Sequence, residues 1–206
     1  MQAIMLSTTA EWVAKILNHE KYWEIRKLFP RDYVGWVYLY CTKDTKRGYL
    51  QRSDVPNYIA DVLKVKYVLW DKSCVSNKKP VLNGKVVARF WCSRVATIRR
   101  YTEAERTKDD FSYCFDYWAE KPMPEGSMDI QQGSCLLFSQ LNKYAGKRKE
   151  LRAISITQLE VFDKPKEIGE FKVAYKYKQF FYDGEYEEED LKLLTKAPQS
   201  WCWIEI

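Results

Sequence analysis

The chain has 206 residues, of which 46% are hydrophobic and 16% aromatic, and charges of both signs leave a net charge of +6. A chain of this length buries roughly 70% of its unfolded surface, so this composition allows a real core, and the mixed sign of the charges argues against intrinsic disorder. The positive excess favours nucleic acid or another anion as partner, although a soluble basic protein without such a partner carries a similar charge.

Cysteine and histidine usage excludes several kinds of site. The six cysteines are scattered with no C-x-x-C spacing, and His19 is the only histidine, so we expect no metal site, redox motif or cofactor. A nucleophilic Ser-His or Cys-His pair would have to use His19, which removes most triads. Free thiols, no export signal and no apolar stretch of membrane-span length predict a cytoplasmic protein outside the membrane.

The chain begins with a predicted strand and a predicted helix. Residues 3–7 form a short apolar run that is typical of a buried strand. Residues 9–18 carry apolar side chains one helical turn apart, and Thr9 is placed to cap the helix. Residues 33–42 are rich in aromatic and branched residues, which predicts another strand.

After Asn18, between the predicted helix and the strand at 33–42, the spacing of apolar residues changes from a helical period to a period of two. Trp23 and Ile25 alternate with Glu24 and Arg26, which predicts a half-buried strand with the charged pair projecting from the solvent face. The stretch is therefore a helix end, a turn and a strand, with Glu24 and Arg26 facing out together.

The rest of the chain adds further strands with helices inserted between them. Strands are predicted at 84–100, 151–163 and 197–206, helices at 54–64, 102–121 and 134–146, and loops or turns at 71–84, 122–133 and 164–171. Strict alternation of strand and helix is absent, so a parallel doubly wound sheet is not expected. An α+β fold, built as a mostly antiparallel and partly closed β-barrel decorated with helices, fits this order better.

Residues 5–27 resemble the opening of an ASCH domain, a member of the PUA-like superfamily. That family has a strand, a helix and a G-x-K-x-x-E-x-R motif, and here Lys21, Glu24 and Arg26 stand at the motif positions, with His19 in place of the glycine. Residues 84–98, 151–171 and 197–206 are similar to later segments of the family. The resemblance implies one PUA-like domain over residues 1–206, with a less-matched insertion at about 43–83.

The resemblance also implies a cleft near the first helix that binds RNA or a modified nucleotide. Arg26 would grip a phosphate or stack on a base, Glu24 would accept hydrogen bonds from an exocyclic amine, and Lys21 would reach a phosphate. The alternative is an ion-paired network that stabilises the barrel mouth, although exposed pairs contribute only about 0–1 kcal/mol. The candidate ligand-binding residues are Lys21, Glu24, Arg26, Ser7, Gln199, Ser200 and Trp201.

Several of these candidates have a second interpretation. Ser7 and Thr8 either donate hydrogen bonds to a ligand or cap the helix. Trp201 and Trp203 share one face of the last strand, where they either stack bases or pack in the core. His19 is either a plain turn residue or a gate at the cleft. The basic runs at 98–101 and 146–152 either follow a phosphate backbone or are solvated loops.

Two other classes of function stay open. Some small ASCH members are amidohydrolases that act on acylated cytidine, in which the lysine works with a threonine three residues on. Here that position holds Glu24, so Lys21 and Glu24 are the catalytic candidates only if the chain is a hydrolase or ribonuclease. A protein-interaction module with an exposed apolar patch is the third possibility.

Overall fold

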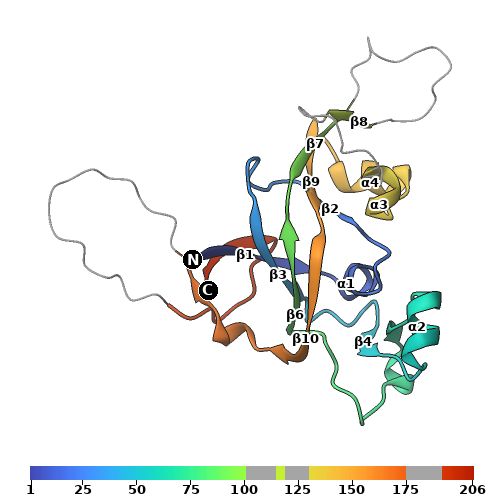
Figure 1. Cartoon of the computed structure of the whole chain (residues 1–206). Coiled ribbons are helices and arrows are strands. Elements are labelled where there is room, and N and C mark those ends of the chain that lie inside the picture. Colours follow the sequence, from blue (N-terminus) through green and yellow to red (C-terminus); the bar gives the residue numbers. More distant parts are fainter. Residues whose placement is uncertain (101–114, 119–129, 175–191) are drawn as a thin grey trace, which may run out of the picture.

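The computed structural model describes residues 1–100, 115–118, 130–174 and 192–206 (Figure 1). Its helices are α1 (Ala10–Leu17), α2 (Asn57–Leu63), α3 (Ile130–Ser134) and α4 (Phe138–Ala145), with 3-10 turns at Lys72–Cys74 and Ile168–Glu170. Within these ranges no helix has both the length and the apolar character that a membrane span requires.

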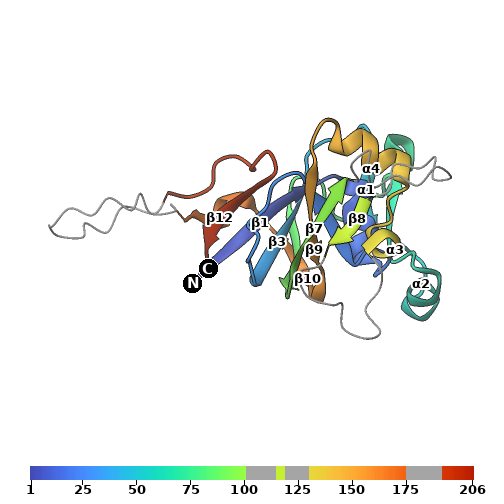
Figure 2. The same cartoon turned by 90° about the horizontal axis from the view of Figure 1, so that it is seen from above.

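The largest sheet has six strands and holds both chain ends. Its strands, in spatial order, are β10 (Thr157–Lys166), β6 (Val86–Cys92), β3 (Gly35–Cys41), β1 (Gln2–Thr8), β12 (Trp201–Glu205) and β11 (Lys172–Val173). The pair β1 and β3 is parallel, and the other pairs are antiparallel. Figure 2 shows the helices on the side of the molecule opposite the two termini.

Two smaller sheets complete the described fold. The antiparallel four-stranded sheet has the order β2 (Trp23–Arg26), β9 (Glu150–Ser155), β7 (Val95–Arg100) and β8 (Phe115–Trp118), and β4 (Tyr49–Arg52) pairs with β5 (Tyr67–Trp70). The α+β class is therefore confirmed. None of the three sheets closes on itself within the described residues, so the barrel stays a prediction, as does the single domain.

Apolar side chains fill three buried clusters. The first lies between α1 and one face of the six-stranded sheet and includes Ile4, Leu6, Val13 and Phe90. A second joins the four-stranded sheet to α3 and α4, and a third covers the opposite face of the six-stranded sheet. Burial of apolar area of this kind is the main favourable term in folding.

The strand predicted over residues 84–100 is wrong in one respect, because it is two strands in two sheets. β6 ends at Cys92 and β7 begins at Val95. At the corner the Ser155 hydroxyl accepts hydrogen bonds from the backbone N–H of Ser93 and of Arg94. The predicted strand 151–163 divides in the same way into β9 and β10, since each sheet buries its own apolar face.

Four other expectations need correction. The helix predicted over 102–121 is contradicted at 115–118, where β8 pairs with β7; its remaining residues lie outside the described ranges. The predicted loop at 122–133 contains the start of α3, and the predicted turn at 164–171 begins within β10. Thr9 occupies the N-cap position of α1, but its side chain makes no capping hydrogen bond.

Candidate functional site

The turn between α1 and β2 positions the motif residues. Asn18 ends the helix with its N–H donating to the Ala14 carbonyl, and His19 has φ 55°, in the left-handed region. A residue other than glycine adopts this region at a steric cost, which explains why the related motif carries glycine there. His19 therefore lies in a turn with positive φ, and its possible role as a gate at the cleft stays a prediction.

Lys21 is buried immediately after this turn, with 2% of its residue surface exposed. Its ammonium donates a hydrogen bond to the Ser134 carbonyl at the end of α3, and its Nζ lies 3.5 Å from Glu24 Oε2. The same Nζ lies 4.9 Å from the centre of the Trp12 ring on α1. The lysine therefore joins α1, β2 and α3.

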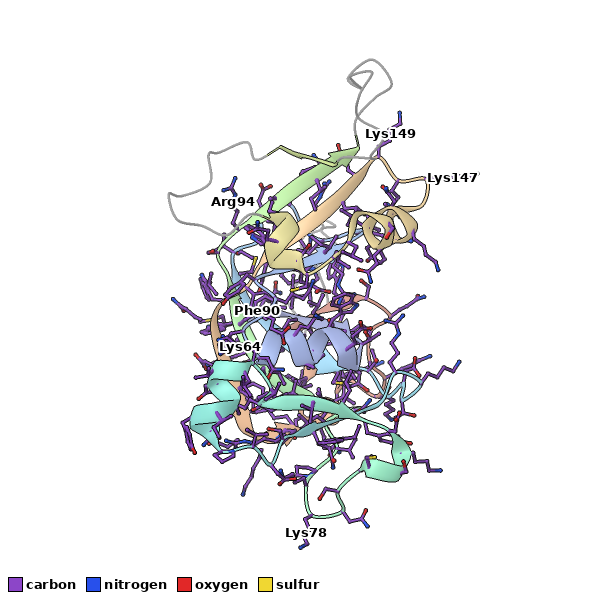
Figure 3. The ribbon with its side chains drawn as sticks, turned by 90° about the vertical axis from the view of Figure 1, so that its right-hand side faces the viewer. Lys64, Lys78, Phe90, Arg94, Lys147 and Lys149 are labelled. Atoms are coloured by element: carbon purple, nitrogen blue, oxygen red, sulfur yellow. The ribbon has the colours of Figure 1, made fainter. Side chains whose placement is uncertain are left out.

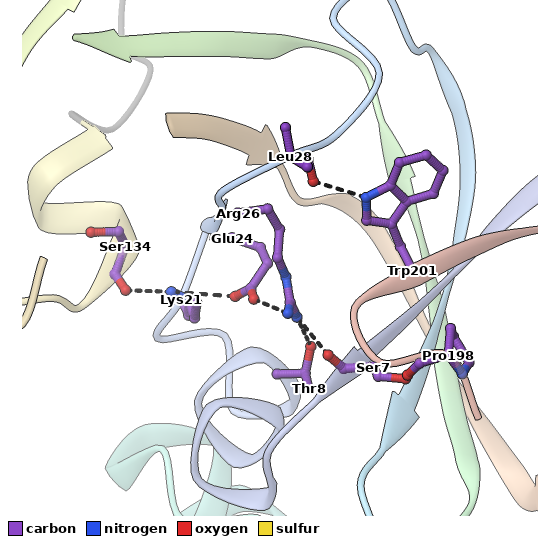
Figure 4. A network of polar contacts seen from close by, with 9 residues as sticks. All are labelled: Ser7, Thr8, Lys21, Glu24, Arg26, Leu28, Ser134, Pro198 and Trp201. Carbon is purple, nitrogen blue, oxygen red and sulfur yellow. Dashed lines mark hydrogen bonds and ion pairs between the residues drawn. The ribbon is translucent and has the colours of Figure 1, made fainter. Parts of the chain in front are cut away.

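Glu24 links Lys21 to Arg26. Arg26 Nη2 lies 2.8 Å from Glu24 Oε1 and also donates hydrogen bonds to the Ser7 carbonyl at 2.7 Å and to Thr8 Oγ1 at 2.6 Å (Figure 4). Arg26 Nε is buried and has no hydrogen-bond partner among the described residues. The Arg26 Nε–H is thus a hydrogen-bond donor without a partner within the described residues, close to the end of β1.

The expectation that Glu24 and Arg26 face solvent is wrong. The two side chains do share a face, and Trp23 and Ile25 pack on the opposite one in the core under α3 and α4, as predicted. However, only 6% of the Glu24 side chain and 11% of that of Arg26 is exposed. The reason is that the end of β1 covers the second face of β2, so both faces of this strand are buried.

Burial changes the protonation of the lysine. Loss of hydration lowers the pKa of Lys21 below its ordinary value of 10.5, and the nearby Arg26 adds to this effect, whereas Glu24 and Cys135 act to raise it. A lysine with a lowered pKa releases its proton more easily than an exposed lysine.

The other sequence-predicted residues adjoin this network to different extents. The Ser7 hydroxyl donates to the Pro198 carbonyl and its N–H donates to the Ser200 carbonyl, so the serine caps no helix. Trp201 Nε1 donates to the Leu28 carbonyl, and its ring packs edge-on against Phe29. Gln199 is exposed, and no hydrogen bond within the described residues joins its side chain to Lys21, Glu24 or Arg26.

The tryptophan pair of the last strand belongs largely to the core. Trp201 and Trp203 share a face and are partly buried against the cluster under α1, while Cys202 packs on the opposite side of the sheet. Their rings meet edge-on with centroids 6.3 Å apart. The core interpretation of Trp203 is therefore the better one, and Trp201 is held by its indole hydrogen bond.

A cavity of about 330 Å³ opens beside Lys21. It lies between the end of α1 and the junction of β9 with β10, and its walls are mainly apolar; the remaining lining residues are Ile16, His19, Tyr22, Ile156, Thr157, Gln158 and Leu159. Gln158, like His19, has a positive φ, at 45°. Sequence reasoning missed this cavity, since its two sides come from segments more than a hundred residues apart.

Neither a protein-family model nor a curated protein matches the sequence. Solved structures do. The ASCH protein from Zymomonas mobilis superimposes with a TM-score of 0.50 at 11% identity, over 98% of this chain and 87% of that one. The chain has an ASCH-like fold. A point mutant of the Zymomonas mobilis ASCH protein matches over 80% of this chain and 75% of that one, with a TM-score of 0.44 and 10% identity.

At such identities the likeness to ASCH proteins concerns the fold. Trp12, Ser134 and Cys135 were not predicted as part of the site, whereas Thr8 was considered beside Ser7 as a ligand contact or a helix cap. Ser134 and Cys135 carry no local signal for it, because they reach Lys21 only through the packing of α3 on β2.

Proposed function

We propose that this protein binds RNA or a modified nucleotide at the site of Lys21, Glu24 and Arg26. The observation that carries the proposal is the burial of three charged side chains in one network. Moving a charged group out of water costs several kcal/mol, and well-packed apolar residues in place of a buried ion pair are often neutral or stabilising. Fold stability alone is therefore a poor reason to keep such a network.

The unused donor of Arg26 supports the same proposal. A buried polar atom without a partner costs about 1–3 kcal/mol, and an acceptor oxygen of a base or a phosphate would satisfy it. The adjacent cavity is within the usual size range of small-molecule sites, and its apolar walls suit the faces of a planar base. Lys21 lines the cavity and Arg26 does not, so the cavity would supply apolar contacts beside Lys21 while Arg26 would supply polar contacts near the end of β1.

Binding is tested by titrating labelled single-stranded RNA, duplex RNA and a panel of free modified nucleosides into the wild type and into Arg26→Met. Arg152→Met is the matched control, because Arg152 is a buried arginine paired with Glu150 on β9, directly opposite Arg26 in the register. We expect Arg26→Met to weaken binding at least tenfold, while the control binds like the wild type. Thermal unfolding of each variant establishes that it is folded.

The proposal fails if the wild type binds none of these molecules. It also fails if folded Arg26→Met and Arg152→Met bind equally well.

Hydrolysis of a modified nucleoside is the second candidate, and the lowered pKa of Lys21 favours it. A lysine with a lowered pKa is available as a base or a nucleophile nearer neutral pH than an exposed lysine. Incubation with an acylated cytidine, followed by mass spectrometry, tests for release of the acyl group. We expect Lys21→Met to abolish any turnover in a variant that thermal unfolding shows to be folded, and turnover that survives in this variant excludes Lys21 as the catalytic group.

A further inference from the structure

Most of the net charge of the protein is concentrated in one segment. Residues 43–83 contain nine lysines and arginines and four aspartates, a net charge of +5 out of +6 for the whole chain. This segment, called the basic lobe below, consists of the β4–β5 hairpin, helix α2 and the 3-10 turn at Lys72–Cys74. The rest of the protein is therefore nearly neutral.

Some cations of the basic lobe are neutralised by neighbours. Lys66 pairs with Asp61 at 3.5 Å, and Lys79 pairs with Asp54. A third cation, Arg47, pairs at 2.9 Å with a glutamate of α1 outside the lobe. These pairs hold the lobe together without removing its positive excess.

Three exposed lysines of the lobe place part of its net positive charge at the surface. Lys64 ends α2, Lys72 lies in the 3-10 turn and Lys78 lies in the following loop, and within the described residues none of them forms an ion pair. Figure 3 labels Lys64 and Lys78. Exposed ammonium groups on three separate elements of the lobe are the kind of point charge that binds the phosphates of a nucleic acid.

An aromatic ring accompanies these charges. Tyr58 lies in the first turn of α2 with 74% of its surface exposed. Rings beside cations are typical of surfaces on which nucleic-acid bases stack. The lysines alone would also attract an acidic protein segment. The Tyr58 ring adds a stacking surface, which favours a nucleic-acid base as the partner.

The lobe is joined directly to the motif turn. The buried Asn18 side chain donates to the Tyr67 carbonyl at 2.8 Å and accepts from the Tyr67 N–H at 2.9 Å. Asn18 immediately precedes His19, so these two hydrogen bonds attach β5 to the turn that leads from α1 to Lys21. A single-stranded RNA bound along the lobe would therefore come close to the proposed nucleotide site.

A second group of cations lies on the other side of α1. Lys147, Arg148 and Lys149 are exposed in the turn between α4 and β9, and Figure 3 shows Lys147 and Lys149 at the end of the molecule opposite Lys78, with α1 between them. Positive charge thus flanks the motif region at both ends of this face.

We propose that the basic lobe binds the sugar-phosphate backbone of a single-stranded RNA, one nucleotide of which occupies the Lys21–Arg26 site. The inference rests on the function proposed above and adds the surface that holds the rest of the strand. Lys64, Lys72 and Lys78 contact phosphates, and Tyr58 stacks on a base. Free nucleosides, which have no phosphate, do not use the lobe.

The test compares two triple variants that remove the same charge. Lys64→Gln/Lys72→Gln/Lys78→Gln changes the lobe, and Lys164→Gln/Lys172→Gln/Lys196→Gln changes exposed lysines on β10, β11 and the segment before β12. Binding of a labelled single-stranded RNA, about 20 nucleotides long, is measured from about 50 to 300 mM KCl, together with binding of the nucleoside that performs best. Thermal unfolding again verifies the fold.

Each lost phosphate contact lowers the slope of log K against log salt by about 0.7 for a single strand. The lobe variant loses three such contacts, so it should bind RNA on the order of 100-fold more weakly at about 0.1 M salt. Its salt dependence should therefore be shallower by about 2. The control variant should lose less than about threefold with an unchanged slope, since it removes long-range attraction only. Nucleoside binding should be the same in both.

Equal RNA binding and equal slopes for the two variants overturn the lobe proposal, even if Arg26→Met abolishes binding. If the lobe variant loses RNA affinity while Arg26→Met does not, the nucleotide site fails and backbone binding by the lobe stands. Poly-glutamate that binds as tightly as the RNA would overturn the choice of nucleic acid. RNA that does not bind the wild type at all overturns both proposals.

Discussion

The Lys21–Arg26 network and the basic lobe lie on either side of the turn at His19, and they carry charge in opposite ways. In the network three charges are buried and have fixed partners from β1, β2 and α3. In the lobe the surplus lysines stand in water without an acidic partner within the described residues. Buried charges give geometry and selectivity, whereas exposed charges give long-range attraction that salt screens.

The contrast predicts a large loss of stability when the network is broken. Glu24→Ala leaves Lys21 and Arg26 buried without their carboxylate, and we expect the free energy of unfolding to fall by about 3–5 kcal/mol. Urea denaturation measures it. Glu160→Ala, which removes the exposed partner of Arg89, should cost no more than about 1 kcal/mol, and equal losses would contradict the distinction between buried and exposed pairs.

Asn18 offers a way to separate the two regions. Asn18→Ala leaves both backbone groups of Tyr67 without their buried partner, and we expect a loss of about 1–3 kcal/mol. Hydrogen exchange at the Tyr67 amide should become faster. Asn77→Ala, at an exposed position of the lobe, is the control and should be near neutral; unchanged exchange in Asn18→Ala would show that the lobe is held elsewhere.

The lowered pKa of Lys21 predicts a pH dependence of the free energy of unfolding. Between that lowered pKa and 10.5 the unfolded chain holds the proton and the folded chain does not. Stability should therefore rise with pH in this window, by up to about 1.4 kcal/mol per pH unit, and the full cost of burying the charge applies below it.

Lys21→Met should lose this rise when its urea midpoints are compared with those of the wild type between about pH 7 and pH 10. Lys72→Met, at an exposed site, should keep it. Parallel curves for wild type and Lys21→Met would show that Lys21 keeps an ordinary pKa.

His19, at the junction of the two regions, should give the smallest effect. His19→Gly relieves the left-handed conformation at φ 55° but increases the entropy of the unfolded chain, so we expect a gain of no more than about 1 kcal/mol. Nucleoside affinity should change little if His19 is only a turn residue. A change of more than about tenfold in a folded variant would support the alternative role as a gate.

Local sequence signals predicted much of the N-terminal part of the fold. The helix that ends near Asn18, the turn at His19 and the strand containing Trp23 and Ile25 follow from periodicity, as do α2 and the last strand. The β4–β5 hairpin was not predicted, because two four-residue strands give little periodic signal. The split of 84–100 between two sheets was not predicted, because the corner is held by hydrogen bonds to the Ser155 hydroxyl, which lies far along the chain.

The order of residues therefore determines which side chains share a face: Trp23 with Ile25, Glu24 with Arg26, and Trp201 with Trp203. It does not determine what covers each face, because that depends on segments far apart in the chain. Packing of α3 and of the end of β1 around β2 removed water from the expected surface charges. The same packing lowered the pKa of Lys21 and made a solvent-facing strand into a buried ionic site.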